Sequence, residues 1–237
     1  MLILGIDTST EILSVALCHY DEEEEEHETL ALVVEETKNN QSEILMSRID
    51  QVVKEAKIKL SDLDRIAIGI GPGSYTGVRV GVTAAKTLAY ALGIPITPIS
   101  SLKVMQYCDL KYFLRIPMID AKRGNIFASG LDATKFGNTV IPEGLYQIDE
   151  LIEEVKKLKF KDIAFIGSGA VANKDKILEL NNEGFSVGVI KELDLKQTKA
   201  EHLAFDTVYD EDTPPVPVHE VVPNYLRKTD AEISAGV

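Results

Sequence analysis

Residues 71–93 read GPGSYTGVRVGVTAAKTLAYALG, and this stretch decides the fold of the 237-residue chain. Gly71 and Gly73 permit a backbone turn that bulky residues could not make, directly after the apolar run RIAIGI. The pattern predicts a strand that leads into a helix over 75–92. Free backbone N–H groups collect at such a junction, which can hold an anion or can be a tight strand-to-helix turn without a ligand.

The predicted helix is apolar around nearly its whole circumference, which is typical of a helix that is buried on all sides. Gly77, Gly81, Ala85 and Ala89 recur every four residues and form one stripe of small side chains, over which another helix can approach closely. One face must pack on the chain's own sheet. The other face needs a cover, which is either the helix predicted over 41–57 or a partner subunit.

The residues before this stretch predict three antiparallel strands. Apolar runs at 2–6 and 12–18 flank the polar turn DTSTE, and strand character resumes at 29–36. An acidic run, DEEEEEHE at 21–28, falls where the second turn is expected, so its like charges are solvated. Apolar residues then recur at helical spacing over 41–57.

The second half of the chain repeats this order of elements less clearly. Strand-like runs such as RIPMID and DIAFIGSGA alternate with helical runs such as DELIEEVKKLKF, and a last helix is predicted near 197–209. Such a pattern favours two α/β lobes. We place them at 1–104 and 105–237, and leave room for the last residues to return to the first lobe.

Composition limits the classes of partner. The chain has 25 Lys and Arg against 38 Asp and Glu, a net charge of −13, so its surface as a whole repels nucleic acid. No apolar stretch approaches the roughly 20 residues that span a bilayer, and no basic region precedes the first apolar run. We therefore expect a cytoplasmic protein without a membrane partner. Cys18 and Cys108 match no redox or zinc spacing.

Five segments of the chain resemble the TsaB family: IDTST at 6–10, QSEILMSRIDQVVKEA, residues 71–102, IDAKRGNIFAS at 119–129 and NYLRK at 224–228. The resemblance implies a two-lobed α/β fold of the actin-like, ribonuclease-H-like (ASKHA) class. It also implies the function of an accessory subunit that makes no catalytic step itself. Its complex makes threonylcarbamoyladenosine in tRNA, next to the anticodon.

The same resemblance implies that a catalytic metal is absent. Sequences of the catalytic paralogue TsaD carry a His-x-x-x-His pair at the stretch matching 95–105, whereas this chain has Ser101 and Met105 there. The hydroxyl of Ser101 and the thioether of Met105 do not replace histidine as metal ligands at such a site, because both lack the lone pair of an imidazole nitrogen. The four histidines do not replace that pair, because no two of them are three or four residues apart: His19, His27, His202 and His219.

A nucleotide site is the weaker expectation. Actin-like ATPases place a carboxylate at the end of the first strand, which is the position of Asp7, and Thr8 and Ser9 could donate hydrogen bonds to a phosphate. Glycine turns that could accompany such a site contain Gly71, Gly73, Gly167 and Gly169. The residues after Asp7 also satisfy a hairpin turn without any ligand. ATP is therefore the one cofactor that we consider, and no Walker or dinucleotide motif is present.

The resemblance implies a docking role, in which helices 41–57 and 75–92 pair with the equivalent helices of TsaD. Nine residues are expected at this interface: Leu45, Ile49, Val52, Val53, Val78, Gly81, Val82, Ala85 and Ala89. The expected partners are TsaD and the ATPase TsaE, with tRNA met only through the complex. Without TsaD, the same faces could form a homodimer.

Two alternatives remain open from the sequence. One is an actin-like kinase that uses Asp7 and the glycine turns to phosphorylate a small molecule with magnesium ATP. Against it, no acceptor site with a general base is recognisable. The other is a homodimeric, chaperone-like module.

The basic pair Lys122 and Arg123 either faces a ligand or RNA or lies in an exposed turn.

Overall fold

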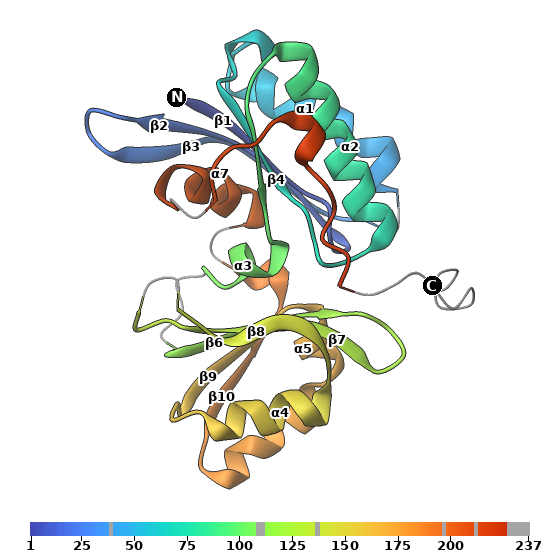
Figure 1. Cartoon of the computed structure of the whole chain (residues 1–237), viewed down its shortest axis with the longest axis vertical. Coiled ribbons are helices and arrows are strands. Elements are labelled where there is room, and N and C mark those ends of the chain that lie inside the picture. Colours follow the sequence, from blue (N-terminus) through green and yellow to red (C-terminus); the bar gives the residue numbers. More distant parts are fainter. Residues whose placement is uncertain (38–39, 108–111, 136–137, 196–197, 211–212, 227–237) are drawn as a thin grey trace. The chain divides into compact units, whose positions relative to one another are not determined.

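The computed structural model describes residues 1–37, 40–107, 112–135, 138–195, 198–210 and 213–226. The chain forms two compact units (Figure 1). The first unit contains Met1–Asp109 and Glu192–Pro223, and the second contains Leu110–Lys191 and the residues from Asn224 onward.

A mixed five-stranded sheet forms the centre of the first unit. Its strands are β1 (Leu2–Asp7), β2 (Ile12–Asp21), β3 (Glu26–Glu36), β4 (Arg65–Gly69) and β5 (Ile96–Ile99). They lie in the order β3-β2-β1-β4-β5. The first three strands are antiparallel, as predicted, whereas β4 and β5 run parallel to β1.

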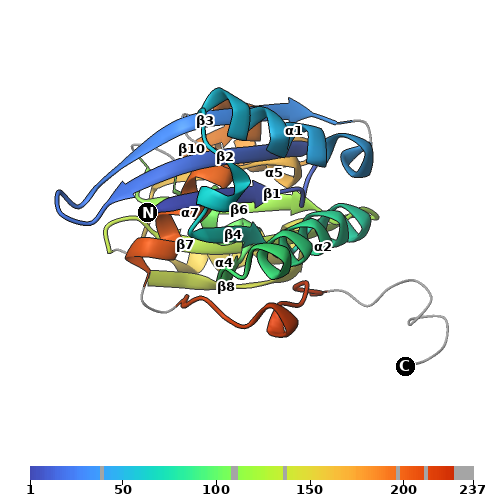
Figure 2. The same ribbon diagram turned by 90° about the horizontal axis from the view of Figure 1, so that it is seen from above.

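Helices cover both faces of this sheet (Figures 1 and 2). The helices of the unit are α1 (Gln41–Glu55), α2 (Tyr75–Leu92), the short α3 (Ser101–Met105) and α7 (Lys199–Tyr209). Residues alternate along β1, so that Leu4 and Ile6 pack with α1 and α2, whereas Ile3 packs with α7. Ser74 caps the start of α2, and Gly93 ends it at a φ of 68°.

The second unit repeats the strand order of the first. Its strands are β6 (Leu114–Asp120), β7 (Asn125–Asp132), β8 (Asn138–Gln147), β9 (Asp162–Ile166) and β10 (Ser186–Ile190), in the order β10-β9-β6-β7-β8. Its helices are α4 (Ile148–Lys157), α5 (Ser168–Ala172) and α6 (Lys174–Leu178). Three antiparallel strands followed by two parallel strands occur in both units, and this duplicated ribonuclease-H-like topology confirms the predicted fold class.

Turns of 3₁₀-helix complete the described elements. They are η1 (Leu60–Asp62), η2 (Glu179–Glu183), η3 (Glu192–Asp194) and η4 (Val218–Glu220). No helix within the described ranges is both long and apolar enough to cross a membrane.

The observed units differ in extent from the lobes expected at 1–104 and 105–237. The first unit continues to Asp109, and the chain returns to it at Glu192, well before the last residues. The physical reason is that α7 packs on β1, β2 and β4, where Ala200, Leu203 and Ala204 are buried. The apolar face of this helix therefore belongs to the first core.

Candidate functional site

The best-defined polar cluster of the first unit surrounds Asp7, the last residue of β1. The side chain of Asp7 is fully buried. The backbone N–H and the hydroxyl of Ser9 donate to its Oδ1 atom at 2.9 and 2.7 Å, and the Ser101 hydroxyl donates to its Oδ2 atom at 2.6 Å. Asp7 is thus held by the turn that follows it and by the first residue of α3.

A lysine from the other end of the chain completes this cluster. Lys199, the first residue of α7, places its Nζ atom 2.6 Å from Oδ1 of Asp7 and 2.9 Å from Oε1 of Glu192. The same nitrogen lies 3.0 Å from Oγ of Ser9 and 3.1 Å from Oγ1 of Thr10. We call these residues the Asp7 cluster: Asp7, Ser9, Thr10, Ser101, Glu192 and Lys199.

Burial and charge act in opposite directions on the ionisable groups of the Asp7 cluster. Burial would raise the pKa of Asp7, but the charge of Lys199 and the donated hydrogen bonds outweigh it, so this pKa lies below its ordinary value. Burial raises the pKa of Glu192, and the nearby Asp7 adds to that rise. Burial would lower the pKa of Lys199, but the two carboxylates raise it, so the lysine is a cation at neutral pH.

The glycines of residues 71–93 let the polar turn pack directly on α2. A Cβ atom at Gly73 would lie 2.1 Å from the carbonyl oxygen of Ser9, and one at Gly77 would lie 2.2 Å from that of Thr8. At Gly81 it would lie 2.3 Å from Oγ1 of Thr8. Any larger residue at these positions would therefore separate the helix from the turn.

The structure brings together five of the seven residues that were considered for a nucleotide. Asp7, Thr8 and Ser9 lie against the turn that contains Gly71 and Gly73; the carbonyl of Gly71 accepts from Ser101 N at 2.9 Å. The other two belong to the second unit. There, Gly167 has a φ of 99°, and Gly169 packs closely on Met118 and Ile126, so close packing accounts for this second glycine.

Ser101 and Met105, which stand in place of the histidine pair, are both fully enclosed. Met105 is 1% exposed and belongs to the apolar interior, whereas Ser101 hydrogen-bonds to Asp7. Among the residues that the structure describes, no group of three or more His, Cys, Asp or Glu side chains is placed to hold a metal. The Asp7 cluster instead combines two carboxylates, three hydroxyls and one ammonium group.

The nine residues expected at the partner interface require a correction. All of them are buried in the first unit's own core, between α1, α2 and the sheet: Leu45, Ile49, Val52, Val53, Val78, Gly81, Val82, Ala85 and Ala89. The small-residue stripe faces the turn at Thr8 and the sheet. These side chains are therefore unavailable to a partner in this structure.

A different face of α2 is exposed. We call it the outer face of α2, and its exposed residues are Tyr75, Thr76, Arg79, Thr83, Thr87, Tyr90 and Ala91. Arg79 is the charged residue among them, and its guanidinium lies 3.9 Å from the centre of the Tyr75 ring. Lys86 is half-buried on the same side of the helix, and its Nζ atom donates to the carbonyl oxygen of Val221 at 2.7 Å. Tyr90 is 82% exposed. The helix is thus not enclosed on all sides, and the side that it presents is small, aromatic and nearly uncharged.

The neighbouring helix α1 presents a charged surface. We call it the outer face of α1, and its residues are Ser42, Glu43, Met46, Ser47, Asp50, Lys54 and Glu55. Lys54 pairs with Asp50 at 2.5 Å. The two helices contact each other, so the charged outer face of α1 belongs to the neighbour of α2.

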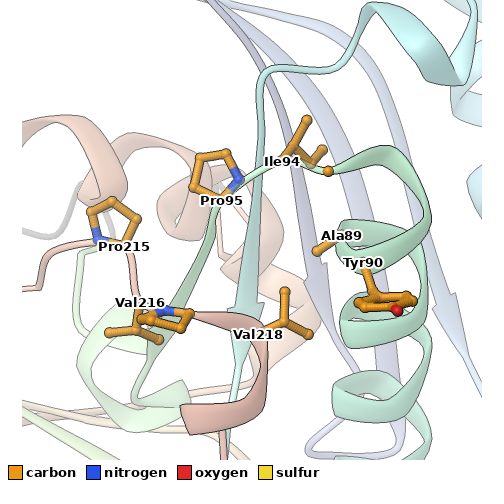
Figure 3. Close-up of a pocket in the computed structure, with 9 residues that line it drawn as sticks. Ala89, Tyr90, Ile94, Pro95, Pro215, Val216 and Val218 are labelled. Carbon is orange, nitrogen blue, oxygen red and sulfur yellow. The ribbon is translucent and has the colours of Figure 1, made fainter.

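An open groove of about 560 Å³ lies at the C-terminal end of α2 (Figure 3). It is lined by Tyr90 on α2, by Pro95 just before β5 and by the segment from Pro215 to Val218. Val216 N donates to the carbonyl of Ile96 at 2.9 Å, so this proline-rich segment pairs with β5 at this point. The groove adds apolar surface next to the outer face of α2.

Lys199 and Glu192 were not identified from the sequence. Both lie within KELDLKQTKAEHL, a charged stretch that is typical of an exposed surface.

Cys18 is buried and its pKa is raised to about 12 by burial, whereas Cys108 and Arg227 lie outside the described residues. Lys122 and Arg123 form the β6–β7 turn with φ angles of 64° and 56°, and Lys122 pairs with Asp120 at 2.9 Å.

Comparison with known proteins gives consistent matches along most of the chain. The family model described as "TsaD: tRNA N6-adenosine threonylcarbamoyltransferase" matches residues 32–235. A Bacillus subtilis protein named tRNA threonylcarbamoyladenosine biosynthesis protein TsaB is 34% identical, over 98% of this chain and 96% of that relative. A Buchnera aphidicola protein of the same name is 31% identical, over 71% of this chain and 79% of its own length.

A solved structure has the same fold. It is a Pseudomonas aeruginosa protein described as similar to peptidase YEAZ, with a TM-score of 0.72 over 95% of this chain and 99% of that chain. The two sequences are 23% identical. This likeness supports the fold of both units and nothing further.

Proposed function

Since the chain belongs to the TsaB family of tRNA threonylcarbamoyladenosine biosynthesis proteins, we propose that it acts there as a non-catalytic subunit that docks on TsaD. TsaD would carry the chemistry of threonylcarbamoyl transfer to the adenosine next to the anticodon. This chain would stabilise the competent state of TsaD by binding to it, which is a shift of population rather than a chemical step.

The observation that carries this proposal is the composition of the outer face of α2. In a chain of which 27% of the residues are charged, the seven exposed residues of this face include one charge, two tyrosines, three threonines and one alanine. The centres of protein interfaces are depleted of charge and enriched in aromatic side chains and arginine. The charged outer face of α1 would then form part of the polar rim. The docking helices are those expected from the sequence, but their contact residues are different.

The Asp7 cluster supports the proposal that this subunit carries out no catalysis of its own. The carboxylate of Asp7 is the group that a kinase would need for magnesium ATP, and here it is neutralised by Lys199 at 2.6 Å. A metal ion would have to displace a fully buried ammonium group before it reached Asp7. No observation favours the kinase alternative, and calorimetry with magnesium ATP tests it: tight binding with acceptor-dependent release of ADP would support a kinase.

The remaining partners follow from the same proposal. The ATPase TsaE would join the assembly of this chain with TsaD, and tRNA would be bound through the complex, because a net charge of −13 opposes direct binding. In the absence of TsaD, two copies would pair through their α2 outer faces as an isologous dimer. We expect all of these contacts to form in the cytoplasm.

Isothermal titration of the full chain with TsaD from the same organism tests the docking proposal. Thr83→Glu places a charge at the middle of the outer face of α2 and should weaken binding at least tenfold. The matched control is Ser186→Glu, since Ser186 is an exposed residue of β10 in the second unit. The control should bind as the wild type does. Binding of Thr83→Glu with wild-type affinity would refute the proposed interface.

A further inference from the structure

The surroundings of the Lys199 ammonium group are those of a bound cation. Four oxygen atoms from four residues lie 2.6–3.1 Å from its Nζ atom. An ammonium group has only three protons to donate, so four close oxygens mean that its charge, as well as its hydrogen bonds, holds it there. The lysine side chain is 1% exposed, so its charge is solvated by these protein oxygens rather than by bulk water.

The cluster needs a cation for electrostatic reasons. Asp7 comes from the end of β1 and Glu192 from η3, and the exposed fractions of their side chains are 0% and 8%. The other groups around them are hydroxyls and backbone N–H groups, which solvate a carboxylate but do not neutralise it. Two buried carboxylates without a positive charge would be strongly destabilising.

The oxygens are also of the kind that binds hard metal ions. Carboxylates and hydroxyls are ligands for Mg²⁺, Mn²⁺ and Ca²⁺, and Ca²⁺–oxygen distances of about 2.3–2.6 Å are only a few tenths of an ångström shorter than those around Nζ. Ca²⁺ could therefore occupy the position of the nitrogen with a small contraction of the same four residues, whereas a smaller ion would keep water among its ligands.

We propose that Lys199 is a tethered cation that fills a divalent-metal site made by Asp7, Glu192, Ser9 and Thr10. The lysine enters the site from the first turn of α7, so packing of α7 on the sheet closes the site. While α7 is packed, the first unit needs no metal and admits none at Asp7. This inference is independent of docking on TsaD, because none of these residues belongs to the outer face of α2.

The test uses the full chain with Lys199→Ala, prepared in EDTA and then supplied with Mn²⁺. Truncation of the lysine leaves the two carboxylates and room for an ion with its water ligands. We expect one Mn²⁺ per chain, detected by loss of the free-ion signal in electron paramagnetic resonance, and a rise of about 3 °C or more in Tm at saturating Mn²⁺. Mg²⁺ and Ca²⁺ should compete with it.

Two controls distinguish this site from weak surface binding. The wild type and Lys54→Ala, which removes an exposed lysine beside a carboxylate, should show neither effect. Lys199→Ala combined with Glu192→Gln should bind Mn²⁺ at least tenfold more weakly than Lys199→Ala alone. Wild-type chain that binds Mn²⁺ as tightly as Lys199→Ala would overturn the proposal, since Lys199 would then not fill the site.

Folding outcomes also decide the proposal. If Lys199→Ala folds only when Mn²⁺ is present during refolding, the metal has replaced the ammonium group and the proposal is supported. If it folds but binds none of the three ions, the proposal is wrong. If neither Lys199→Ala nor the double variant folds with or without metal, the packing of the lysine rather than its charge is essential, and the proposal is again refuted.

Discussion

The Oγ1 atom of Thr8 donates a 2.7 Å hydrogen bond to the carbonyl oxygen of Gly77 in the first turn of α2. This bond joins the polar turn after β1 to α2, the helix contained in the stretch 71–93 that decides the fold. The bond can form because the glycines of α2 leave no side chain between the two segments. The small-residue stripe is therefore explained by contacts within the first unit, and it does not mark a docking surface.

Substitution of Gly81 should show this contact in stability measurements. Gly81→Ala places a methyl group 2.3 Å from Oγ1 of Thr8, and we expect it to lower the free energy of unfolding by about 2 kcal/mol or more. Gly93→Ala is the control, because no atom lies within 4 Å of its Cβ position. Its cost should be only the roughly 1 kcal/mol of a left-handed backbone.

Removal of the Thr8 hydroxyl should rescue only one of two glycine substitutions. In a Thr8→Ala background, Gly81→Ala should cost less than in the wild type, because its clash is with the Thr8 side chain. Gly77→Ala should gain no such relief, because its clash is with the Thr8 backbone. Urea unfolding of the four-member cycles measures the difference. Equal rescue of both glycine variants would show that the contacts are wrongly placed.

Charge substitutions on opposite faces of α2 should differ sharply in their effect on stability. Ala85 is fully buried, so Ala85→Glu places a carboxylate in the core and should lower the free energy of unfolding by at least about 3 kcal/mol. Thr83 is exposed, so Thr83→Glu should change it by no more than about 0.5 kcal/mol. Thermal unfolding compares the two variants. A stable, folded Ala85→Glu protein would mean that the stripe is exposed after all.

Asp206 should make a contribution to stability that is present below about pH 4 and is lost as the pH rises to about 6. Burial raises the pKa of Asp206 to about 6; the charge of Lys103 opposes this rise, and the charge of Asp210 adds to it. Burial and the same two carboxylates raise the pKa of Tyr107. The folded state therefore binds a proton more tightly than the unfolded chain, whose aspartate pKa is near 4. Ionisation on the way to neutral pH costs the fold up to about 3 kcal/mol.

Asp206→Asn should remove this pH dependence. The variant keeps the shape of the side chain without its charge, so it should be more stable than the wild type at pH 7 and nearly equal to it at pH 4. Urea unfolding at a series of pH values measures the difference. A difference that stays constant from pH 4 to pH 7 would mean that Asp206 does not titrate in this range.

Much of the fold could be predicted from the sequence because local patterns determine it. The turn at 71–74, the helix after it and the three strands before it all follow from glycine placement and hydrophobic periodicity. The return of the chain at Glu192 could not be predicted in this way. It depends on which sheet accepts the apolar side of α7, and this choice is made by packing between residues far apart in sequence.

The candidate site was predictable only in part, for a similar reason. Asp7 and the residues after it were identified, because a polar turn after a buried strand is visible in the sequence. Lys199 and Glu192 stand in a stretch of mixed charge, and only tertiary contact distinguishes them from exposed residues. The direction in which α2 faces was not predicted, because its Val, Ala and Leu residues spread around nearly the whole circumference of the helix.

Hydroxyl-radical footprinting tests most directly whether the outer face of α2 meets TsaD. The wild-type chain offers two tyrosines for comparison: Tyr90 on this face, 82% exposed, and Tyr209 on α7 at the other face of the sheet, 44% exposed. Oxidation of both is followed at a dilution where the chain is monomeric, with and without TsaD. We predict that TsaD slows oxidation of Tyr90 at least fivefold and leaves Tyr209 within about twofold. Unchanged oxidation of Tyr90 in a complex that forms would contradict the proposed docking face.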